Sequence, residues 1–162
     1  MNDITPELFR KASGNWTTGV SVVTTSDVDG KPYGLTMNAV TSLSLNPPLF
    51  LICVDNRSDT LEPIRRSGVF CINVLAAAQQ NVSNAFAKKG DDKFGGVSYE
   101  RGVTGAPLLT GRLMAVECHV TAYHEAGDHK IFVGEVKNID VDPDETAQPL
   151  LYYRGRYAAL AP

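Results

Sequence analysis

The alternation of apolar and polar residues predicts a chain built mainly from β-strands. β-branched residues are frequent in these segments, and turn-forming Gly, Asn, Asp and Pro residues separate most of them. The segment 49–54 is apolar throughout, which predicts a strand buried on both faces. We expect about seven strands. Between residues 97 and 110 we expect irregular structure with one or two short strands. The predicted strands are residues 19–25, 31–36 with its continuation 35–45, 49–54, 69–75, 113–124, 131–141 and 148–153.

Two or three short helices are predicted outside the strands. Thr5-Pro6-Glu7 combines a hydroxyl N-cap, a proline at the first helical position and an acid in the first turn, which predicts a helix to about Ala12. A second helix is expected from residue 61 to about 67, and an Ala- and Gln-rich third from 76 to 88. Because helices and strands do not alternate regularly, the order favours a mostly antiparallel barrel with peripheral helices over a doubly wound parallel sheet.

One predicted strand carries an unusual set of neutral polar side chains. Within residues 35–45, apolar residues are mixed with Thr36, Asn38, Thr41, Ser42 and Ser44. Such groups offer hydrogen bonds without net charge, which suits the edge of a large, flat, neutral ligand. The same composition also fits a Thr- and Ser-rich edge strand that binds nothing. The two prolines that follow, at 47 and 48, are predicted to stop this strand because neither has a backbone N–H.

Composition and charge narrow the class of protein. The length of 162 residues suggests one domain, residues 1–162. The chain has 15 basic and 18 acidic residues and no basic run, which gives no support for nucleic-acid or membrane binding. The N-terminus lacks a signal-peptide pattern, and no apolar run approaches the roughly 20 residues that span a bilayer. Cys53, Cys71 and Cys118 lie in apolar strand-like runs, which predicts buried free thiols and a cytoplasmic location.

Two polar motifs are candidates for ligand binding. Residues 56–60 combine an arginine, hydroxyl side chains and a helix start, which suits a phosphate group, although simple helix capping gives the same pattern. His129 follows Gly127 and Asp128 in a predicted hairpin, where it is either a ligand contact or an ordinary turn-flanking residue. No metal site is predicted, because His119 and His124 are an odd number of residues apart on one strand and point to opposite faces.

Several motifs occur in a fixed order from about residue 8 to residue 158. They are Phe9-Arg10-x-Ala12, the strand Gly19-Val-Ser-Val-Val-Thr-Thr25, Gly34-Leu-Thr-Met-Asn38, Ser42-Leu-Ser-Leu-Asn-Pro47, Gly127-Asp-His129, Gly134-Glu-Val136 and Pro149-Leu-Leu-Tyr-Tyr-Arg-Gly-Arg-Tyr157. Together they resemble the flavin reductase family. These are short-chain NAD(P)H:flavin oxidoreductases that form the reductase half of two-component flavin-dependent monooxygenases.

The resemblance implies a fold, a reaction and partners. The implied fold is the FMN-binding split β-barrel, an antiparallel, Greek-key-like arrangement with two or three short peripheral helices. The implied reaction transfers a hydride from NADH, or alternatively NADPH, to FMN or FAD. Reduced flavin then supplies a partner monooxygenase. The resemblance also implies a homodimer with the flavin near the subunit interface, while no nucleic-acid or membrane partner is implied.

The resemblance further implies roles for individual residues. His129 would bind and orient the nicotinamide as the catalytic-site histidine, with Arg156 and Tyr157 at the same mouth. The residues implied for the flavin are Leu35, Thr36, Met37, Asn38 and Ala39 along the ring; Cys53, Val54 and Asp55 beside it; Arg57, Ser58 and Thr60 at the phosphate; and Phe86, Ala87, Lys88 and Lys93 from the third helix and the loop after it. No acid–base pair is required, because the flavin carries the redox chemistry.

Two other functions remain open at this level. One is a flavin-binding redox protein with a different acceptor, such as a corrinoid or a metal chelate. The other is a non-catalytic flavin-binding sensor. The motif around His129 and the motif at Arg156 and Tyr157 favour an enzyme, because a sensor would need no second ligand.

Overall fold

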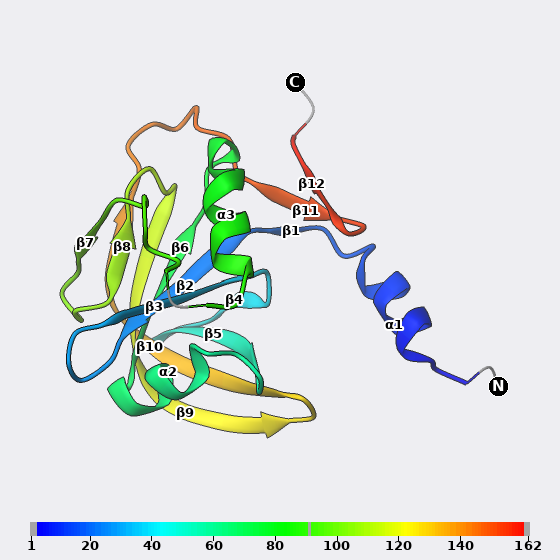
Figure 1. The fold of residues 1–162 in the computed structure, drawn as a ribbon, viewed down its shortest axis with the longest axis horizontal. Helices are drawn as coiled ribbons and strands as arrows, with labels where there is room; N and C mark the ends of the chain where they lie inside the picture. The colour runs from blue at the N-terminus through cyan, green and yellow to red at the C-terminus, as the bar shows by residue number, and fades with distance from the viewer. Residues whose placement is uncertain (1–2, 91, 161–162) are drawn as a thin grey trace.

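The computed structural model describes residues 3–90 and 92–160 and shows a mostly β architecture with helices at its periphery (Figure 1). Its strands are β1 (Thr18–Gly19), β2 (Ser21–Ser26), β3 (Pro32–Met37), β4 (Val40–Leu45), β5 (Pro48–Asp55), β6 (Val69–Val74), β7 (Tyr99–Arg101), β8 (Pro107–Leu109), β9 (Met114–Ala126), β10 (His129–Val141), β11 (Leu151–Tyr153) and β12 (Arg156–Ala158). Its α-helices are α1 (Pro6–Ser13), α2 (Leu61–Ser67) and α3 (Gln80–Ala87), and a 3-10 helix (Ala77–Gln79) leads into α3.

Seven of these strands form one antiparallel sheet whose two edges are neighbours in the sequence. The strand order is β3-β2-β6-β9-β10-β5-β4. Only Asn38 and Ala39 join the edge strands β3 and β4, so the sheet has to curl until its edges approach each other. The Cys53 N–H donates to the Ala39 carbonyl at 3.0 Å and holds this link against β5. The predicted split, mostly antiparallel β architecture is therefore confirmed. We name the unclosed line between β3 and β4 the seam.

The main apolar core lies inside the curled sheet. Ile52, Phe70, Val116 and Phe132 come from the neighbouring strands β5, β6, β9 and β10 and are fully buried. Full burial of a side chain of this size stabilises the fold by about 1.5–3 kcal/mol. Gly134 on β10 makes the packing possible, because a Cβ at this position would lie 2.5 Å from Cζ of the Phe70 ring.

Helix α3 lies directly on β3 and forms one wall of the region next to the seam. Phe86 from α3 is buried in a second apolar cluster that includes Leu75. A Cβ on Gly34 would lie only 2.7 Å from Cε1 of Phe86, so the glycine permits this close approach. The Thr36 hydroxyl donates to the Ser83 carbonyl at 2.6 Å and ties the strand to the helix. The position of α3 is therefore fixed relative to the end of β3.

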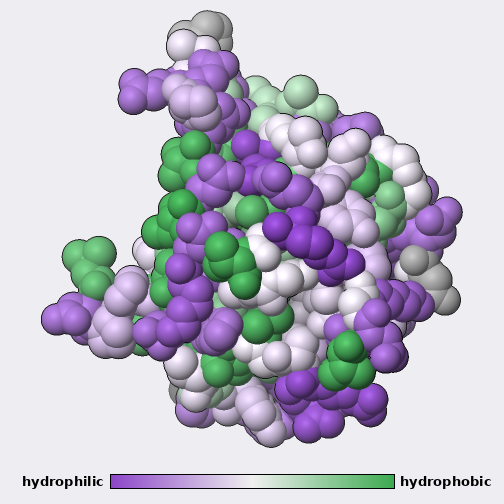
Figure 2. Space-filling model, turned by 90° about the vertical axis from the view of Figure 1, so that its left-hand side faces the viewer, coloured by the Kyte–Doolittle hydropathy of each residue, from purple (hydrophilic) through white to green (hydrophobic). Residues whose placement is uncertain are grey.

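Helix α1 projects from the body of the molecule (Figure 1). It begins as predicted, with the Leu8 N–H donating to the Thr5 hydroxyl at 3.2 Å, and none of its residues is buried. Its base is held by the turn between β11 and β12, where the Arg154 N–H donates to the Gly14 carbonyl at 2.8 Å. On the side facing away from α1, hydrophilic residues separate several small apolar patches (Figure 2). Within the described residues, no helix is long and apolar enough to cross a bilayer.

Three sequence predictions near the seam are wrong. The predicted strand 35–45 is two strands, because the chain passes from one edge of the sheet to the other at residues 38 and 39. The second of them, β4, does end before the two prolines as predicted, and Pro48 is the first residue of β5, a position where a missing N–H is tolerated. β5 is not buried on both faces either: Ile52 and Val54 are buried, whereas Leu51 and Cys53 are half-buried. Cys53 is consequently not a fully buried thiol.

The other differences concern short or terminal elements. The predicted third helix, 76–88, is divided into the 3-10 helix and α3. The strand predicted at 148–153 is shortened to β11, the strand predicted at 19–25 is divided between the end of β1 and β2, and the three-residue strand β12 was not predicted. The described part of the chain thus contains twelve strands instead of about seven. In contrast, α2 begins and ends as predicted, the β9–β10 hairpin is confirmed, and Cys71 and Cys118 are buried free thiols.

Candidate functional site

Three adjoining hollows follow the seam. The first and second share Thr36 and Ala87, and the second and third share Asn38, so we treat them as one groove, the seam groove. The cationic hollow is lined by Leu35, Thr36, Asp55, Arg57, Ser58, Asp59, Phe86, Ala87, Lys88, Lys89 and Lys93. The middle hollow is lined by Val20, Thr36, Met37, Asn38, Ser83, Ala87, Tyr152 and Tyr157. The apolar hollow is lined by Ser13, Trp16, Thr18, Asn38, Ala39, Val40, Thr41, Leu51 and Cys53.

The cationic hollow gathers basic side chains at the end of β5 and the end of α3. Arg57 forms a two-pronged ion pair with Asp55, with Nε–Oδ1 and Nη2–Oδ2 distances of 3.1 and 2.7 Å. This contact holds the pKa of the Asp55 carboxyl well below its usual range. The Arg57 side chain remains 78% exposed, and its Nη1 is not used in the pair, so it retains donors for an anion. Lys88, Lys89 and Lys93 add further positive charge to the lining of the same hollow.

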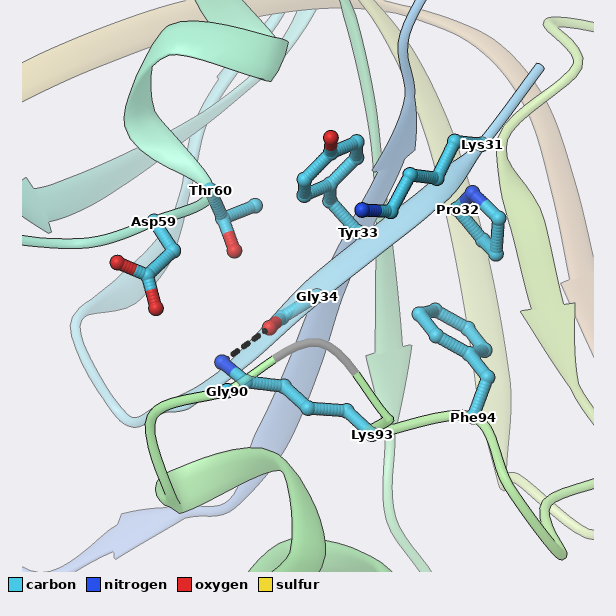
Figure 3. Close-up of a pocket in the computed structure, with 9 residues that line it drawn as sticks. All are labelled: Lys31, Pro32, Tyr33, Gly34, Asp59, Thr60, Gly90, Lys93 and Phe94. Atoms are coloured by element: carbon cyan, nitrogen blue, oxygen red, sulfur yellow. Dashed lines mark hydrogen bonds between the residues drawn. The ribbon is translucent and has the colours of Figure 1, made fainter.

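Lys93 closes a small side pocket next to the cationic hollow (Figure 3). Its ammonium group donates to the Gly34 carbonyl at 3.1 Å, and burial lowers the pKa of this lysine. Asp59 and Thr60 lie on one side of the pocket and the aromatic ring of Tyr33 on another (Figure 3). Lys93 lines both cavities, so it connects the side pocket to the cationic hollow.

The middle hollow is walled by an aromatic side chain whose polar group is already satisfied. The Tyr157 hydroxyl donates to Asn84 Oδ1 at 2.9 Å and lies 2.9 Å from the Ser83 hydroxyl. This network ties β12 to α3 and holds Tyr157 in the lining of the middle hollow, which Met37 also lines. The Tyr157 ring is therefore the part of this residue that faces the hollow, because its hydroxyl is already hydrogen-bonded within the protein.

The apolar hollow lies between the base of α1 and strands β4 and β5. Trp16 forms one side and is 78% exposed, and Cys53 forms another, where burial raises the pKa of its thiol. Thr18 also lines this hollow, and its hydroxyl is one of two side-chain polar atoms in the described residues that are buried without a hydrogen-bond partner. A buried hydroxyl without a partner costs stability.

His129 lies at the tip of the β9–β10 hairpin, next to the cationic end of the groove. It is the direct strand partner of Asp55 in the pairing of β10 with β5. Its Nδ1 atom is 2.7 Å from Asp128 Oδ1, and this hydrogen bond lowers the pKa of the Asp128 carboxyl. The Asn56 N–H donates to the Asp128 carbonyl at 2.9 Å. The hairpin tip is thereby attached to the turn that carries Arg57.

The structure brings most of the predicted residues together. All of the flavin candidates line the seam groove except Val54, which is buried in the core, and Thr60, which is buried at the side pocket. His129 lies outside the lining of the three hollows, and Arg156 is exposed on β12. The lining residues that sequence reasoning did not assign are Ser13, Trp16, Thr18, Val20, Val40, Thr41, Leu51, Asp59, Ser83, Lys89 and Tyr152. They come from many separate elements. Val20, Thr41, Asp59 and Tyr152 lie within segments that the sequence motifs already single out, but these motifs assign them no role, and the others belong to no motif.

Comparison with known families matches residues 13–161 to the flavin reductase like domain. The chain belongs to this family. It is 40% identical over 159 residues to the reductase subunit HsaB of a flavin-dependent monooxygenase from Rhodococcus jostii, a match that covers 98% of this chain and 80% of HsaB. The family assignment confirms the resemblance found in the motifs.

Solved structures of related proteins share the fold. Nitrilotriacetate monooxygenase component B from Mycobacterium thermoresistibile superposes with a TM-score of 0.92 at 36% identity, covering 96% of this chain and 87% of that one. The NADH:FAD oxidoreductase SgcE6 of Streptomyces globisporus, solved with NAD and FAD fragments, has a TM-score of 0.91 at 34% identity, with coverage of 100% and 98%. Both match nearly the full length of the described chain.

The seam groove has the chemistry that a flavin requires. Its cationic hollow suits a phosphate, and the neutral polar side chains of Thr36 and Asn38 suit the edge of a ring that carries both hydrogen-bond donors and acceptors. No group of three or more His, Cys, Asp or Glu residues that could hold a metal ion occurs in the described ranges.

Proposed function

We propose that this chain is an NADH-dependent flavin reductase that supplies reduced FMN or FAD to a separate monooxygenase. The observation that carries the proposal is the seam groove, which joins a cationic hollow to two neutral hollows and has His129 next to one end. Relatives described as reductase subunits of flavin-dependent monooxygenases support the assignment of the partner. The relative described as NADH:FAD oxidoreductase supports NADH as reductant and FAD as one acceptor.

In this proposal, the cationic hollow binds the flavin phosphate. Arg57 and the Ser58 hydroxyl lie at the end of β5, and Lys88 and Lys93 face them from the α3 side. Charge-assisted hydrogen bonds of this kind are stronger than neutral ones. Asp55 restrains the Arg57 guanidinium through its two-pronged contact, which uses Nε and Nη2 and leaves Nη1 for the phosphate.

The neutral part of the groove binds the flavin ring in the same proposal. β3 residues from Leu35 to Met37 and the link at Asn38 and Ala39 provide one side, and Cys53 from β5 provides another. When bound, the flavin supplies the redox chemistry, accepting a hydride from the reduced nicotinamide. The protein then has to bind both molecules in a stacked arrangement and exclude water from the contact.

The nicotinamide is assigned to the mouth of the groove near the β9–β10 hairpin. His129 is the residue proposed to bind and orient it, and Arg156 on β12 is proposed to contact the rest of NADH or NADPH. Tyr157 contributes its ring as a wall, because its hydroxyl is committed to Asn84 and Ser83. Flavin binding does not depend on His129 in this scheme.

We also propose that the single domain works in the cytoplasm as a homodimer in which the second copy covers the apolar hollow. An isolated eight-residue helix is only marginally stable in water, yet α1 exposes Phe9 and, just beyond its end, Trp16. The edge strand β4 likewise leaves Leu45 96% exposed. A second copy that covers both surfaces would bury these side chains. Free thiols at all three cysteines support the cytoplasmic location.

The oligomeric state can be measured directly. We expect the wild-type protein to sediment as a dimer and Phe9→Asp to sediment as a folded monomer with weaker flavin binding. Lys11→Asp, which changes the charge of the same helix in the last turn, serves as the control and should remain a dimer. A wild-type monomer at micromolar concentration would contradict the dimer.

The reaction is tested by mixing the purified protein with NADH and either FMN or FAD and following loss of the NADH absorbance. The proposal predicts rapid NADH oxidation that saturates with added flavin and continues over many turnovers. Flavin binding without NADH consumption would contradict it and point to a sensor. NADH consumption that requires a corrinoid or a metal chelate, with no turnover of free flavin, would indicate a different acceptor.

A further inference from the structure

The Asp128–His129 contact at the hairpin tip involves one of the two ring nitrogens of His129. Asp128 Oδ1 lies 2.7 Å from His129 Nδ1, and the pKa of Asp128 is lowered by this bond, so the group facing Nδ1 is a carboxylate. A carboxylate only accepts hydrogen bonds, so Nδ1 must be the donor. In the neutral ring, Nε2 is then an acceptor with no proton of its own.

The backbone around this contact is held in place from two directions. Gly127 has a φ of +65°, the left-handed conformation that lets the chain turn tightly before Asp128. Asn56 binds the outer side of the turn: its N–H donates to the Asp128 carbonyl at 2.9 Å, and its side-chain amide donates to the Gly127 carbonyl at 3.4 Å. Asp128 therefore presents its carboxylate to His129 from a fixed turn and not from a free loop.

We infer that Asp128 is a positioning residue that fixes His129 as the Nδ1–H tautomer, so that Nε2 accepts a hydrogen bond from the carboxamide NH2 group of a reduced nicotinamide. This inference rests on the proposed function, which assigns the nicotinamide to His129. It adds a chemical selection: a nicotinate ring, which has a carboxylate in place of the carboxamide, offers no donor to Nε2. The site should therefore discriminate between reduced nicotinamide and reduced nicotinate dinucleotides.

Other charged groups near the imidazole leave this assignment unchanged. Asp55 lies opposite His129 across the strand pair and is occupied by Arg57 through both of its carboxylate oxygens. On the hairpin itself, Lys130 is occupied by Glu125. Asp128 is thus the carboxylate that bonds the imidazole directly, and Glu125 offers a matched control, since its removal changes the charge of the same hairpin without changing a His129 contact.

The tautomer is measured on ¹⁵N-histidine-labelled protein without any ligand, with the His129 signals assigned by comparison with His129→Gln. The inference predicts Nδ1–H in the wild type and in Glu125→Gln. In Asp128→Ala, the signals should move toward the Nε2–H form. A wild-type ring that is mainly Nε2–H, or an Asp128→Ala ring unchanged from wild type, would overturn the inference regardless of activity.

The selection is measured as the ratio of KM values for the reduced acid analogue and NADH, with the same flavin. For wild type and Glu125→Gln, we expect the KM for the acid analogue to be about tenfold higher than the KM for NADH. This is the scale expected when one hydrogen bond is lost and a polar group of the site is left unpaired. Asp128→Ala should reduce this ratio several-fold with kcat nearly unchanged. A ratio that collapses in His129→Gln but not in Asp128→Ala would overturn the role of Asp128 and leave the proposed function intact. A ratio unaffected by either change would remove His129 from the nicotinamide site and contradict both.

Discussion

Two regions of this barrel use charged side chains in opposite ways. On the closed side, the Glu117 carboxylate is fully buried, and it accepts hydrogen bonds from the N–H groups of Val103 and Thr104, the Thr104 hydroxyl and the Asn138 amide. At the seam, Arg57 is largely exposed and keeps donors that the protein does not use. The contrast indicates that the closed side uses charge to hold the chain together, while the seam leaves positive charge exposed with donors unused.

Replacing Glu117 should break the closed side and have the largest effect. Glu117→Leu leaves buried N–H groups in the loop between β7 and β8 without acceptors, and we expect a loss of about 3 kcal/mol in the free energy of unfolding. Urea denaturation provides the measurement. The exposed carboxylate Glu100 is the matched control, and Glu100→Leu should cost far less. Equal losses in the two variants would refute the structural role of the buried carboxylate.

The same carboxylate predicts a dependence of stability on pH. Burial raises the pKa of Glu117, but the hydrogen bonds from Thr104, Asn138 and Val103 outweigh burial and hold the pKa below the ordinary value of 4.5. A carboxyl whose pKa is lowered by folding contributes stability above its unfolded pKa and loses it as the pH falls through the folded pKa. Glu117→Gln should therefore flatten the acid limb of a plot of unfolding free energy against pH. An acid limb identical to wild type would contradict this.

The contact between α3 and β3 comes next in size and connects the two regions. Gly34→Ala would place a methyl group against the Phe86 ring, and we expect a loss of about 2 kcal/mol in unfolding free energy together with weaker flavin binding. Gly19→Ala is the control, because a Cβ there meets no atom within 4 Å. Thermal unfolding and a flavin titration of both variants give the comparison. If Gly34→Ala binds flavin as wild type does, α3 does not shape the groove.

Removing charge from the seam should affect binding and leave stability unchanged. Arg57→Ala is expected to raise the KM for FMN by about tenfold, the scale of one hydrogen bond to a charged group, without changing the urea midpoint. Arg65→Ala removes the same charge from α2, where the arginine pairs with exposed Glu62, and should leave the KM unchanged. Similar KM values for the two variants would place the phosphate elsewhere.

The smallest predicted effect concerns the nicotinamide. His129→Ala should raise the KM for NADH several-fold, because it removes one neutral hydrogen bond, and should not change the Kd for flavin. His124→Ala, an exposed position on the same hairpin, is the control. Steady-state kinetics at saturating flavin measure the first quantity, and fluorescence titration measures the second. Unchanged kinetics in His129→Ala would separate this residue from the reaction.

The sequence predicted local elements well, because their signals are local. The N-cap at Thr5, the bounds of α2 and the β9–β10 hairpin depend on residues a few positions apart, and all three are confirmed. The break at Asn38 and Ala39 was missed because strand propensity continues across it, and only the closure of the sheet requires the chain to change edges. β1 and β12 are too short to show any periodicity.

The candidate site was predictable to the extent that it follows motifs. The strand from Leu35 to Ala39 and the turn at Arg57 and Ser58 were identified from the family pattern, and they line one groove. Trp16 and Ser83 were missed because each reaches the groove only through the way α1 and α3 pack. The hydrogen bonds of the Tyr157 hydroxyl with Asn84 and Ser83 were also not predictable, because they are tertiary contacts that the sequence motif does not encode.

The central claim is that the seam groove binds a flavin with its phosphate in the cationic hollow. It is tested most directly by measuring the Kd values of FMN and of riboflavin, which has the same ring and no phosphate, for wild type and Arg57→Ala. The account predicts that wild type binds FMN more tightly than riboflavin by at least about tenfold, and that Arg57→Ala loses most of this difference while riboflavin affinity is unchanged. Equal affinities of wild type for the two flavins, or an equal loss for both in Arg57→Ala, would contradict it.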